Sequence, residues 1–464
     1  MSQVPGTQAP EASIRDARPG GPAYAGEVTE EAPVGSTIGA VSARRTPVCV
    51  PASRYTSPEW AALEAERLWP HVWQVACSVD HVREPGDWFE YTCGPLSVLI
   101  VRGGEGHLRA FQNVCLHRGN ELCHGSGSGR AEIRCVYHRW CWDLDGHLRE
   151  IPSRKGFGVI ENDEYGLRRV QVDTWGPMVF VNLDLDAEPL ADFLAPVPDE
   201  TAWLRTDEYA CRALVTVPLP CNWKTGIDAF SETYHVQGIH RQMIPSTDDV
   251  NGPQEVWERH GRLNQPYGIP SPRLRGGASD QEIWESFCAT QGERVGRPSR
   301  DDPGPVPERL ADESVRSLLA RLIRERQAAE GVDLDDFTDA QVTDLHQYNC
   351  FPNISPVFLV ESLALLRMRP GATPDDCFMD LMYFSRVPPG TSRERPVDLT
   401  MDTETADLGG VFNQDLENLQ RAQRGLHQPG FTHLTLSREE MRIESLHRNL
   451  ERYLGIEPTE LTGG

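Results

Sequence analysis

The chain has 464 residues, enough for two or three domains. It carries 45 Lys and Arg against 69 Asp and Glu, and its formal net charge of −24 argues against binding to nucleic acids or to anionic membrane surfaces. No apolar run approaches the roughly 18 residues of a membrane-spanning helix. The N-terminus also lacks a basic segment followed by an apolar one. We therefore expect a cytoplasmic protein that does not bind membranes and keeps its thiols reduced.

The N-terminal segment, residues 1–45, is rich in Pro, Gly, Ala, Ser and Glu and has few large apolar side chains. Such a segment buries too little surface to offset the entropy of ordering, so it is predicted to be a disordered tail. Order is expected to begin near Ser57, a good N-cap, and Pro58, which suits the first helical position. These residues predict a helix over Trp60–Trp69.

Short strands separated by glycines are predicted from residue 88 to residue 183. Three of them are Leu96–Val101, Leu108–Val114 and Met178–Leu183. The sequence thus predicts a small all-β domain which, with its flanking N-terminal helix, spans residues 46–200.

Four residues in this β domain form a distinctive pattern, C-x-H followed by C-x-x-H: Cys115, His117, Cys135 and His138. Two thiolates and two imidazoles in such pairs can hold a [2Fe–2S] cluster of the Rieske type, in which the cysteines bind one iron and the histidines the other. The alternative is a structural zinc site. Zinc sites more often have C-x-x-C followed by two histidines, so the order of the ligands favours the cluster. Most of the other cysteines are expected to be buried free thiols.

A second domain is predicted over residues 201–464. Its expected strands, Ala213–Leu219, Ser362–Met368 and Met379–Val387, suggest an antiparallel sheet with helices on one side. Residues 265–310 are polar and rich in Pro and Gly, which predicts a long insertion loop.

Two helices are predicted in the second half of this domain. Leu310–Glu330 has an amphipathic pattern. Ser437 and Glu440 have the spacing of a capping box. One apolar face of a terminal helix follows it, formed by Ile443, Leu446, Leu450 and Leu454.

The second domain also contains two histidines, His235 and His240, that follow Glu232 and Asp228. Residues five apart on a regular helix are displaced by about 140°, so these imidazoles could share a metal only if the helix ends or bulges between them. Gly238 offers a place for that. On spacing alone the pair is a weak signal, and two surface histidines are the default interpretation.

Segments 113–119, 135–140 and 222–240 together resemble Rieske non-haem iron ring-hydroxylating oxygenases, specifically their catalytic alpha subunit. The resemblance extends over roughly residues 55–455. It implies an α+β fold in which an all-β Rieske [2Fe–2S] domain precedes a catalytic domain with an antiparallel sheet and helices, of the helix-grip or START-like type.

The resemblance also implies a mononuclear Fe(II) site formed by His235, His240 and one distant carboxylate. Asp415 is assigned to that role because the segment 411–418 resembles the corresponding family segment. Glu417 is the local rival, and Asp415 could instead cap the helix that begins there. Two histidines and one carboxylate leave adjacent positions on iron open, where dioxygen can bind beside a substrate.

Two positions depart from the usual family pattern. Glu232 stands where the family usually has Asp, a residue that bridges an iron-ligating histidine to the Rieske histidine of a neighbouring subunit. We expect His138 to be that Rieske partner. Arg139 stands where Gly or Ala usually follows the second Rieske histidine. Asp228 is expected as an auxiliary carboxylate, or else as a solvated or N-terminal helix charge. Phe230, Phe412 and residues near Asn353 are candidate walls of the substrate pocket.

The implied activity is that of a terminal oxygenase that dioxygenates or monooxygenates an aromatic or other hydrophobic organic substrate, as in aromatic hydrocarbon catabolism. The sequence shows no dinucleotide-binding fingerprint, so an external NAD(P)H-dependent reductase, with or without a ferredoxin, is expected to supply electrons. The family implies a homotrimer and leaves open whether a β subunit joins it. The alternatives are a Rieske-type electron carrier without oxygenase activity and a structural zinc protein.

Overall fold

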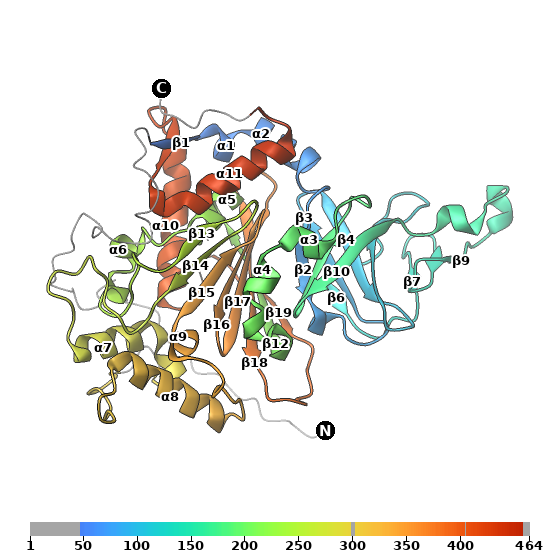
Figure 1. Cartoon of the computed structure of the whole chain (residues 1–464). Helices are drawn as coiled ribbons and strands as arrows, with labels where there is room; N and C mark the ends of the chain where they lie inside the picture. Colours follow the sequence, from blue (N-terminus) through green and yellow to red (C-terminus); the bar gives the residue numbers. More distant parts are fainter. Residues whose placement is uncertain (1–46, 298–301, 404, 458–464) are drawn as a thin grey trace, which may run out of the picture.

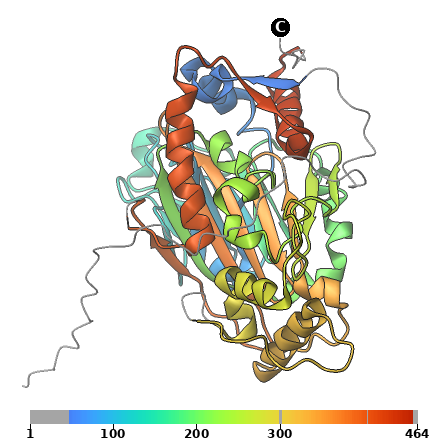
Figure 2. The ribbon, with the colours of Figure 1, turned by 90° about the vertical axis from the view of Figure 1, so that its left-hand side faces the viewer.

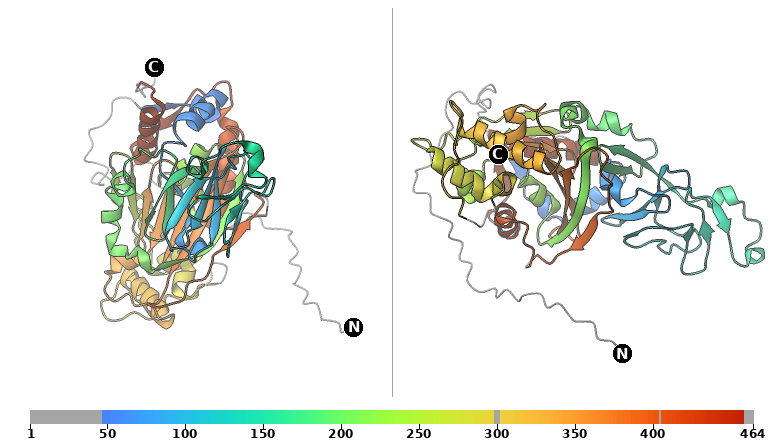
Figure 3. Two further views of the ribbon diagram at one scale, coloured as in Figure 1. Left: turned by 90° about the vertical axis from the view of Figure 1, so that its right-hand side faces the viewer. Right: turned by 90° about the horizontal axis from the view of Figure 1, so that it is seen from below.

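The computed structural model describes residues 47–297, 302–403 and 405–457. The predicted tail, residues 1–45, lies outside this range. The described chain forms a β lobe and a larger lobe that combines a sheet with helices (Figure 1). Seen from below, the β lobe projects to one side of the larger lobe (Figure 3). The predicted α+β architecture is confirmed, with the β lobe preceding the mixed one.

The β lobe contains two antiparallel sheets within the described residues. The larger has seven strands in the order β2-β11-β10-β5-β4-β3-β6. Its strands are β2 (Gln74–Ser78), β3 (Trp88–Cys93), β4 (Leu96–Arg102), β5 (Leu108–Gln112), β6 (Ser126–Gly127), β10 (Arg169–Trp175) and β11 (Met178–Asn182). The smaller comprises β7 (Ile133–Arg134), β8 (Cys141–Trp142) and β9 (Leu148–Glu150). The three strands predicted here are confirmed as β4, β5 and β11, with ends that differ by at most two residues.

The larger lobe is built on one eight-stranded sheet in the order β13-β14-β15-β16-β17-β18-β12-β19. All neighbouring strands are antiparallel except the edge strand β19, which pairs in parallel with β12. The strands are β12 (Tyr209–Leu219), β13 (Gln254–Val256), β14 (Gly261–Gln265), β15 (Leu345–Asn349), β16 (Ile354–Leu359), β17 (Ser362–Pro370), β18 (Cys377–Arg386) and β19 (Val397–Thr400). The predicted antiparallel sheet is thereby confirmed.

Helices cover this sheet, and those that matter for the candidate site are α5 (Trp223–Asp228), α6 (Val236–Ile239), α10 (Gly410–Leu426) and α11 (Met441–Leu454). Helix α5 lies against β17 and β18, and α10 packs on α5. Figure 2 shows α10 running along the same side of the sheet as α5. The remaining α-helices are α1 (Ser53–Thr56), α2 (Pro58–Arg67), α3 (Leu190–Leu194), α4 (Val197–Glu200), α7 (Asp280–Gln291), α8 (Val315–Ala329) and α9 (Asp339–Thr343).

The capping signals account for several helix starts. The Ser57 hydroxyl accepts the Trp60 N–H at 3.1 Å, so α2 begins at Pro58, two residues before its predicted start. The capping box of Ser437 and Glu440 is present before α11, whose four predicted apolar residues are all buried.

The prediction of one long insertion loop over residues 265–310 is wrong for the middle of that segment, which forms helix α7. Ser279 and Glu282 make a capping box there, and Ile283, Trp284 and Phe287 bury one face of the helix. Pro and Gly on both sides obscured this pattern. The helix predicted over 310–330 begins later, at α8, because Ser314 caps it.

The N-terminal segment was predicted to belong with the β domain over residues 46–200, but it packs against the larger lobe. Strand β1 (Val48–Pro51) pairs with β20 (His433–Leu436), and α2 packs on α11. The segment that precedes the β lobe in sequence is therefore attached to the larger lobe. Contacts between residues about 400 positions apart fix this arrangement, which local sequence cannot show.

A buried charge cluster joins the two lobes. Arg367 donates to the carbonyls of Val75 and Ala76 in the β lobe, at 2.5 and 2.8 Å. Its guanidinium and that of Arg369 hold the pKa of the fully buried Asp380 carboxyl well below its usual value, although burial alone would raise it. Among the described residues, no helix combines the length and the apolar character needed to span a membrane.

Candidate metal centres

Two similar turns carry the four predicted Rieske ligands. The first turn follows β5, and the second joins β7 to β8. In each, a backbone N–H donates to the carbonyl of the cysteine four residues earlier, from Gly119 to Cys115 and from Arg139 to Cys135, both at 3.0 Å. The two donors also share a left-handed conformation, with φ of 72° for Gly119 and 65° for Arg139. Arg139 thus occupies a backbone position that favours glycine.

The four side chains converge between these turns. Cys115 and Cys135 are 2% and 1% exposed. Burial and the neighbouring Cys135 thiol raise the pKa of Cys115, against hydrogen bonds from the backbone. The rings of His117 and His138 have centroids 4.5 Å apart, and the buried Nδ1 of His117 has no hydrogen-bond partner among the described residues. Two adjacent thiols and two adjacent imidazoles, one with an unpartnered nitrogen, fit a [2Fe–2S] cluster.

The spacing also disfavours the zinc alternative. Two groups of three donor atoms within 4.8 Å of one another occur among the described residues, and neither includes these four side chains. Ligand atoms around one tetrahedral zinc ion lie about 3–4 Å apart. The cysteine pair and the histidine pair are therefore farther apart than one zinc ion requires.

Apolar side chains surround the histidine end of this centre. Val136 and Tyr137 of the second turn are 80% and 55% exposed. Val159, two residues after Phe157 in the sequence, is 90% exposed. The His117 ring stacks on Trp140 at 5.3 Å and meets the edge of Phe157 at 5.5 Å. The centre lies toward the projecting end of the β lobe, near β7 (Figure 1).

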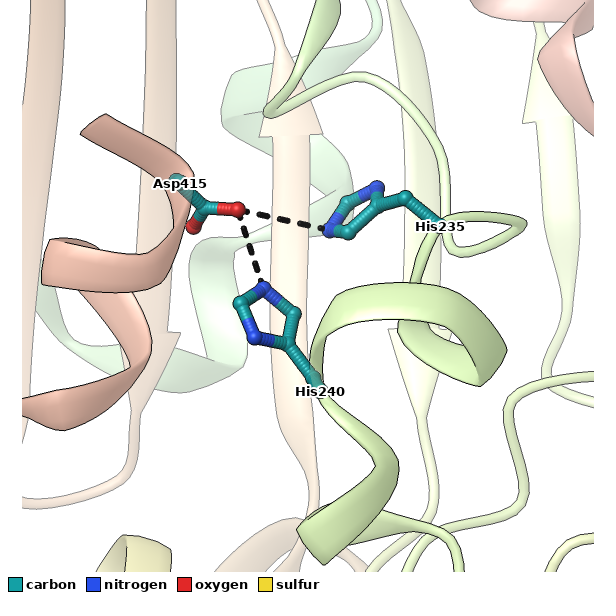
Figure 4. Close-up of side chains that lie close together, drawn as sticks. All are labelled: His235, His240 and Asp415. Atoms are coloured by element: carbon teal, nitrogen blue, oxygen red, sulfur yellow. Dashed lines mark hydrogen bonds and ion pairs between the residues drawn. The ribbon is translucent and has the colours of Figure 1, made fainter. Parts of the chain in front are cut away.

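The second group of donors comprises His235, His240 and Asp415 (Figure 4). Helix α6 has four residues, with His235 immediately before it and His240 immediately after it. His240 leaves the helical conformation, with φ −112° and ψ 40°. Because the helix ends early, the centroids of the two rings lie 5.1 Å apart, which allows both imidazoles to bind one metal ion.

Asp415 faces both histidines from α10. Its Oδ1 lies 3.0 Å from His240 Nε2 and 3.8 Å from His235 Nε2. The side chain is buried and sits inside the helix, which starts at Gly410, so the capping interpretation is wrong. The rival Glu417 is 73% exposed and pairs with Arg421.

Two outer contacts orient the histidines. His235 Nδ1 lies 2.6 Å from Glu232 Oε1, and His240 Nδ1 lies 2.8 Å from Gln414 Oε1. Because both partners are acceptors, each Nδ1 carries the proton and each Nε2 is left to face Asp415. Burial opposes protonation of His235, but Glu232 and Asp415 outweigh it and raise its pKa. Sequence reasoning missed Gln414, whose only signal was its place beside Asp415.

Two imidazole nitrogens and one carboxylate oxygen on a common centre match the donor set of mononuclear non-haem iron. The residues therefore fit a single metal ion with open positions. A closed structural site would need a fourth protein ligand.

Asp228 lies in a buried hydrogen-bonded group beyond Glu232. The Tyr55 hydroxyl lies 2.6 Å from Asp228 Oδ2 and 2.7 Å from His447 Nε2. Burial, reinforced by the charges of Glu440 and Glu232, raises the pKa of Asp228 to about 7 against the effects of Tyr55 and Lys224. Asp228 ends α5, its Oδ1 is buried and its Oδ2 is bonded to Tyr55, so its interpretation as a solvated or N-terminal helix charge is wrong.

The predicted pocket walls separate into two kinds. The rings of Phe230 and Phe412 lie 5.9 Å apart, and Phe412 precedes Asp415 by three residues on α10. Asn353 is fully buried and donates to the Met368 carbonyl at 2.7 Å, which places it in the core of the sheet. All twelve cysteines lie in the described residues, are buried and form no disulfide there.

Residues 203–456, more than half of the chain, match the family described as ring hydroxylating alpha subunit (catalytic domain), and residues 72–170 match the Rieske [2Fe-2S] domain. The chain belongs to this family of ring-hydroxylating alpha subunits. Membership implies a Rieske [2Fe–2S] cluster and a mononuclear iron, and the two donor sets described above fit these groups.

Individual relatives match about half of their own length. Choline monooxygenase of Spinacia oleracea is 33% identical over 203 residues, which are 41% of this chain and 45% of that protein. The carnitine monooxygenase oxygenase subunit of Escherichia coli K12 is 28% identical over 226 residues, 48% of this chain and 59% of that protein.

Solved structures share the fold over most of the chain. Naphthalene 1,2-dioxygenase with indole bound has a TM-score of 0.63 at 16% identity, covering 89% of this chain and 94% of its own. The quaternary ammonium Rieske monooxygenase CntA has a TM-score of 0.62 at 18% identity, covering 87% and 95%. At these identities the similarity concerns the fold.

Proposed function

We propose that this ring-hydroxylating alpha subunit is a terminal oxygenase that hydroxylates a small organic substrate with dioxygen and externally supplied electrons. Cys115, His117, Cys135 and His138 hold the Rieske cluster in this proposal, and His235, His240 and Asp415 hold the mononuclear iron. The observation that carries it is the convergence of two Nε2 atoms on one buried carboxylate oxygen. A Rieske electron carrier would have no use for this second donor set.

When bound, the cluster supplies single electrons and the mononuclear iron supplies open positions for dioxygen. The protein's own groups prepare that site. Glu232 and Gln414 hold the Nδ1 protons of His235 and His240, which fixes the ring orientations and makes both Nε2 atoms better donors. Phe230 and Phe412 supply an apolar wall that limits access of water.

Asp228 is proposed as a proton-holding group for the same reaction. Its pKa near 7 lets it gain or lose a proton at neutral pH, and Tyr55 links it by hydrogen bonds to His447. Its charge and that of Glu232 influence each other, so a change at either carboxylate is felt at the other.

The electrons are proposed to reach the mononuclear site from a neighbouring subunit. Within one chain, the turn beside β7 and helix α6 lie at opposite ends of the molecule (Figure 1). A homotrimer that places His138 of one copy near Glu232 of the next would close this gap. The exposed Val136 and Tyr137 suit such an interface. An external reductase, with or without a ferredoxin, would reduce the cluster.

The proposed substrate class is a small quaternary ammonium compound, attacked by monooxygenation. Choline, glycine betaine and carnitine appear in the names of relatives that match the sequence. An aromatic wall and nearby carboxylates attract such cations. The aromatic substrate predicted from the family resemblance has support only from shared fold with naphthalene 1,2-dioxygenase.

The test measures iron and acid-labile sulfide per chain on anaerobically purified protein, with EPR of the reduced sample. Substrate-dependent oxygen uptake is then measured with a surrogate reductase on choline, glycine betaine, carnitine and naphthalene. A Rieske signal, iron beyond that of the cluster and uptake with a quaternary ammonium compound would support the proposal. Cluster iron alone, unchanged by Fe(II) loading, would leave electron carriage as the function.

A further inference from the structure

A small cavity lies in the larger lobe, between residues of α11, of β14 and β15, and of α5. Its lining includes Arg259, His260, Gly261, Asn349 and Arg442. The space open to the centres of water-sized molecules is about 20 Å³. One water needs about 10–15 Å³ by this measure, so the cavity admits a group the size of one or two waters.

The charge of this lining is unusual for a chain with a net charge of −24. It contains two arginines and a histidine, and no Asp or Glu. Arg259 has its own counter-ion, Glu188, at 2.8 Å and also lies over the Phe193 ring. His260 is neutral, because burial lowers its pKa to about 4 despite its bond to the Phe193 carbonyl.

Since Arg259 is paired and His260 is neutral, Arg442 is the lining residue that brings to the cavity a buried charge with no ion pair in the described part of the chain. It is 3% exposed and donates from Nη1 to Asn349 Oδ1 at 2.9 Å. Its Nε and Nη2 are buried and have no hydrogen-bond partner among the described residues. The charge of Glu232 acts on Arg442, but no ion pair within 4.0 Å joins them in the described structure. Gly261 leaves room for this position, since a Cβ there would meet the Arg442 stem at 3.0 Å.

The buried guanidinium of Arg442 would be stabilised by an anion beside it. A guanidinium stays charged in proteins, and a buried charge without a counter-ion costs several kcal/mol. Two adjacent N–H groups of one guanidinium match the two oxygens of a carboxylate. We propose that this cavity is a binding site for a small monovalent anion of carboxylate size, attracted by the buried positive charge of Arg442.

Two sources offer this chemistry, a free small carboxylate and the carboxylate end of a substrate such as a betaine. The anion site itself does not depend on the proposed reaction. Only the substrate source rests on the proposed function, and it is tested separately below.

The first measurement is the unfolding midpoint of the holoenzyme against formate concentration, with gluconate holding the ionic strength constant. Gluconate is too large for the cavity and serves as the balancing anion. The midpoint should rise saturably by about 5 °C with formate, and Arg442→Met should abolish this rise. Arg452→Met, an exposed arginine on the same helix, is the matched control and should keep the full response.

A crystal of the wild-type holoenzyme grown with bromide keeps the test valid if the Arg442 variant does not fold. An anomalous peak in the cavity beside the Arg442 side chain would support the site. Equal formate responses in wild type and Arg442→Met would overturn the proposal. So would density for water alone, without an anomalous peak.

The source is settled by kinetics. If a substrate carboxylate enters the cavity, formate raises KM for glycine betaine with kcat unchanged and leaves KM for choline unaffected, and Arg442→Met raises the betaine KM about 10–100-fold. Formate that stabilises the protein without changing either KM identifies a free anion as the ligand. Because the midpoint and the anomalous peak need no turnover, failure of the proposed reaction would leave the anion site standing.

Discussion

The two candidate metal centres are built in opposite ways. The Rieske ligands come from two short turns, with only 23 positions between the first ligand and the last, and exposed apolar side chains lie near their histidine end. The mononuclear site joins a broken helix to a residue 175 positions away on α10, and its carboxylate is buried. A local site needs little more than two correctly shaped turns, whereas a dispersed site exists only when the whole lobe is folded. Changes at the two centres should therefore be separable.

Loss of the carboxylate at the dispersed site should have the largest effect. Asp415→Ala leaves two imidazoles without an anionic ligand, so turnover should vanish and iron per chain should fall by about one third. Sulfide content and the Rieske EPR signal should not change. Glu417→Ala, two residues along the same helix but exposed, is the control and should retain full iron. Normal turnover in Asp415→Ala would exclude Asp415 as a ligand.

The complementary change is Cys135→Ala at the local site. It removes a thiolate ligand, so the Rieske signal and the sulfide should be lost together with electron supply to the reaction. The mononuclear site should still take up Fe(II), measured by metal analysis after anaerobic loading. Cys141→Ala, another buried thiol of the same lobe, is the control and should keep the cluster. If Cys135→Ala also abolished Fe(II) uptake, the two centres would not be independent.

Glu232→Gln should have an intermediate effect because it touches the dispersed site from outside. The amide can still accept the Nδ1 proton of His235 but carries no charge, so we expect a 10–100-fold fall in kcat with iron retained. Stopped-flow reduction of the cluster should be unchanged, while its reoxidation by the mononuclear site slows. Glu232→Asp keeps the charge and serves as the matched variant. Equal rates for wild type and Glu232→Gln would argue against a bridging role.

Asp228 should make the stability of the larger lobe depend on pH. Its pKa is raised to about 7, above that of an unfolded Asp, so the folded protein holds the extra proton between about pH 4 and pH 7. This stabilisation is complete below pH 4 and is lost as the pH rises through 7. Asp228→Asn imitates the protonated form at every pH. When the pH is raised from 5 to 8, the unfolding midpoint of this variant should therefore fall less than the midpoint of wild type, by several degrees. Parallel curves for the two proteins by calorimetry would contradict the raised pKa.

The smallest expected effect is at the local site, where Arg139 has a left-handed backbone. Arg139→Gly should relieve about 1 kcal/mol of strain and raise the midpoint of the β lobe by a few degrees. Gly119→Arg places the same strain in the other turn and should lower it by a similar amount. A lower midpoint for Arg139→Gly would mean that contacts of the arginine side chain outweigh the backbone strain.

Several features could be predicted from local patterns. The short apolar runs of β4 and β11 and the cap at Ser57 depend on neighbours in sequence, and the structure confirms them. Helix α7 was missed although its capping box, Ser279 and Glu282, is visible in the sequence, because the flanking Pro and Gly dominated the composition.

The sequence by itself determined the chemistry that each centre can support, because Cys, His and Asp side chains bring their donor atoms wherever the chain places them. It also determined the Rieske turns, whose hydrogen bonds span four residues. Only the tertiary structure decided that Asp415 and not Glu417 faces the histidines, since both lie on one helix and packing of α10 selects its inner face. It likewise left Arg442 buried beside Asn349, without a counter-ion in the described structure. Burial and long-range contact are properties of the folded whole, and no local pattern of residues encodes them.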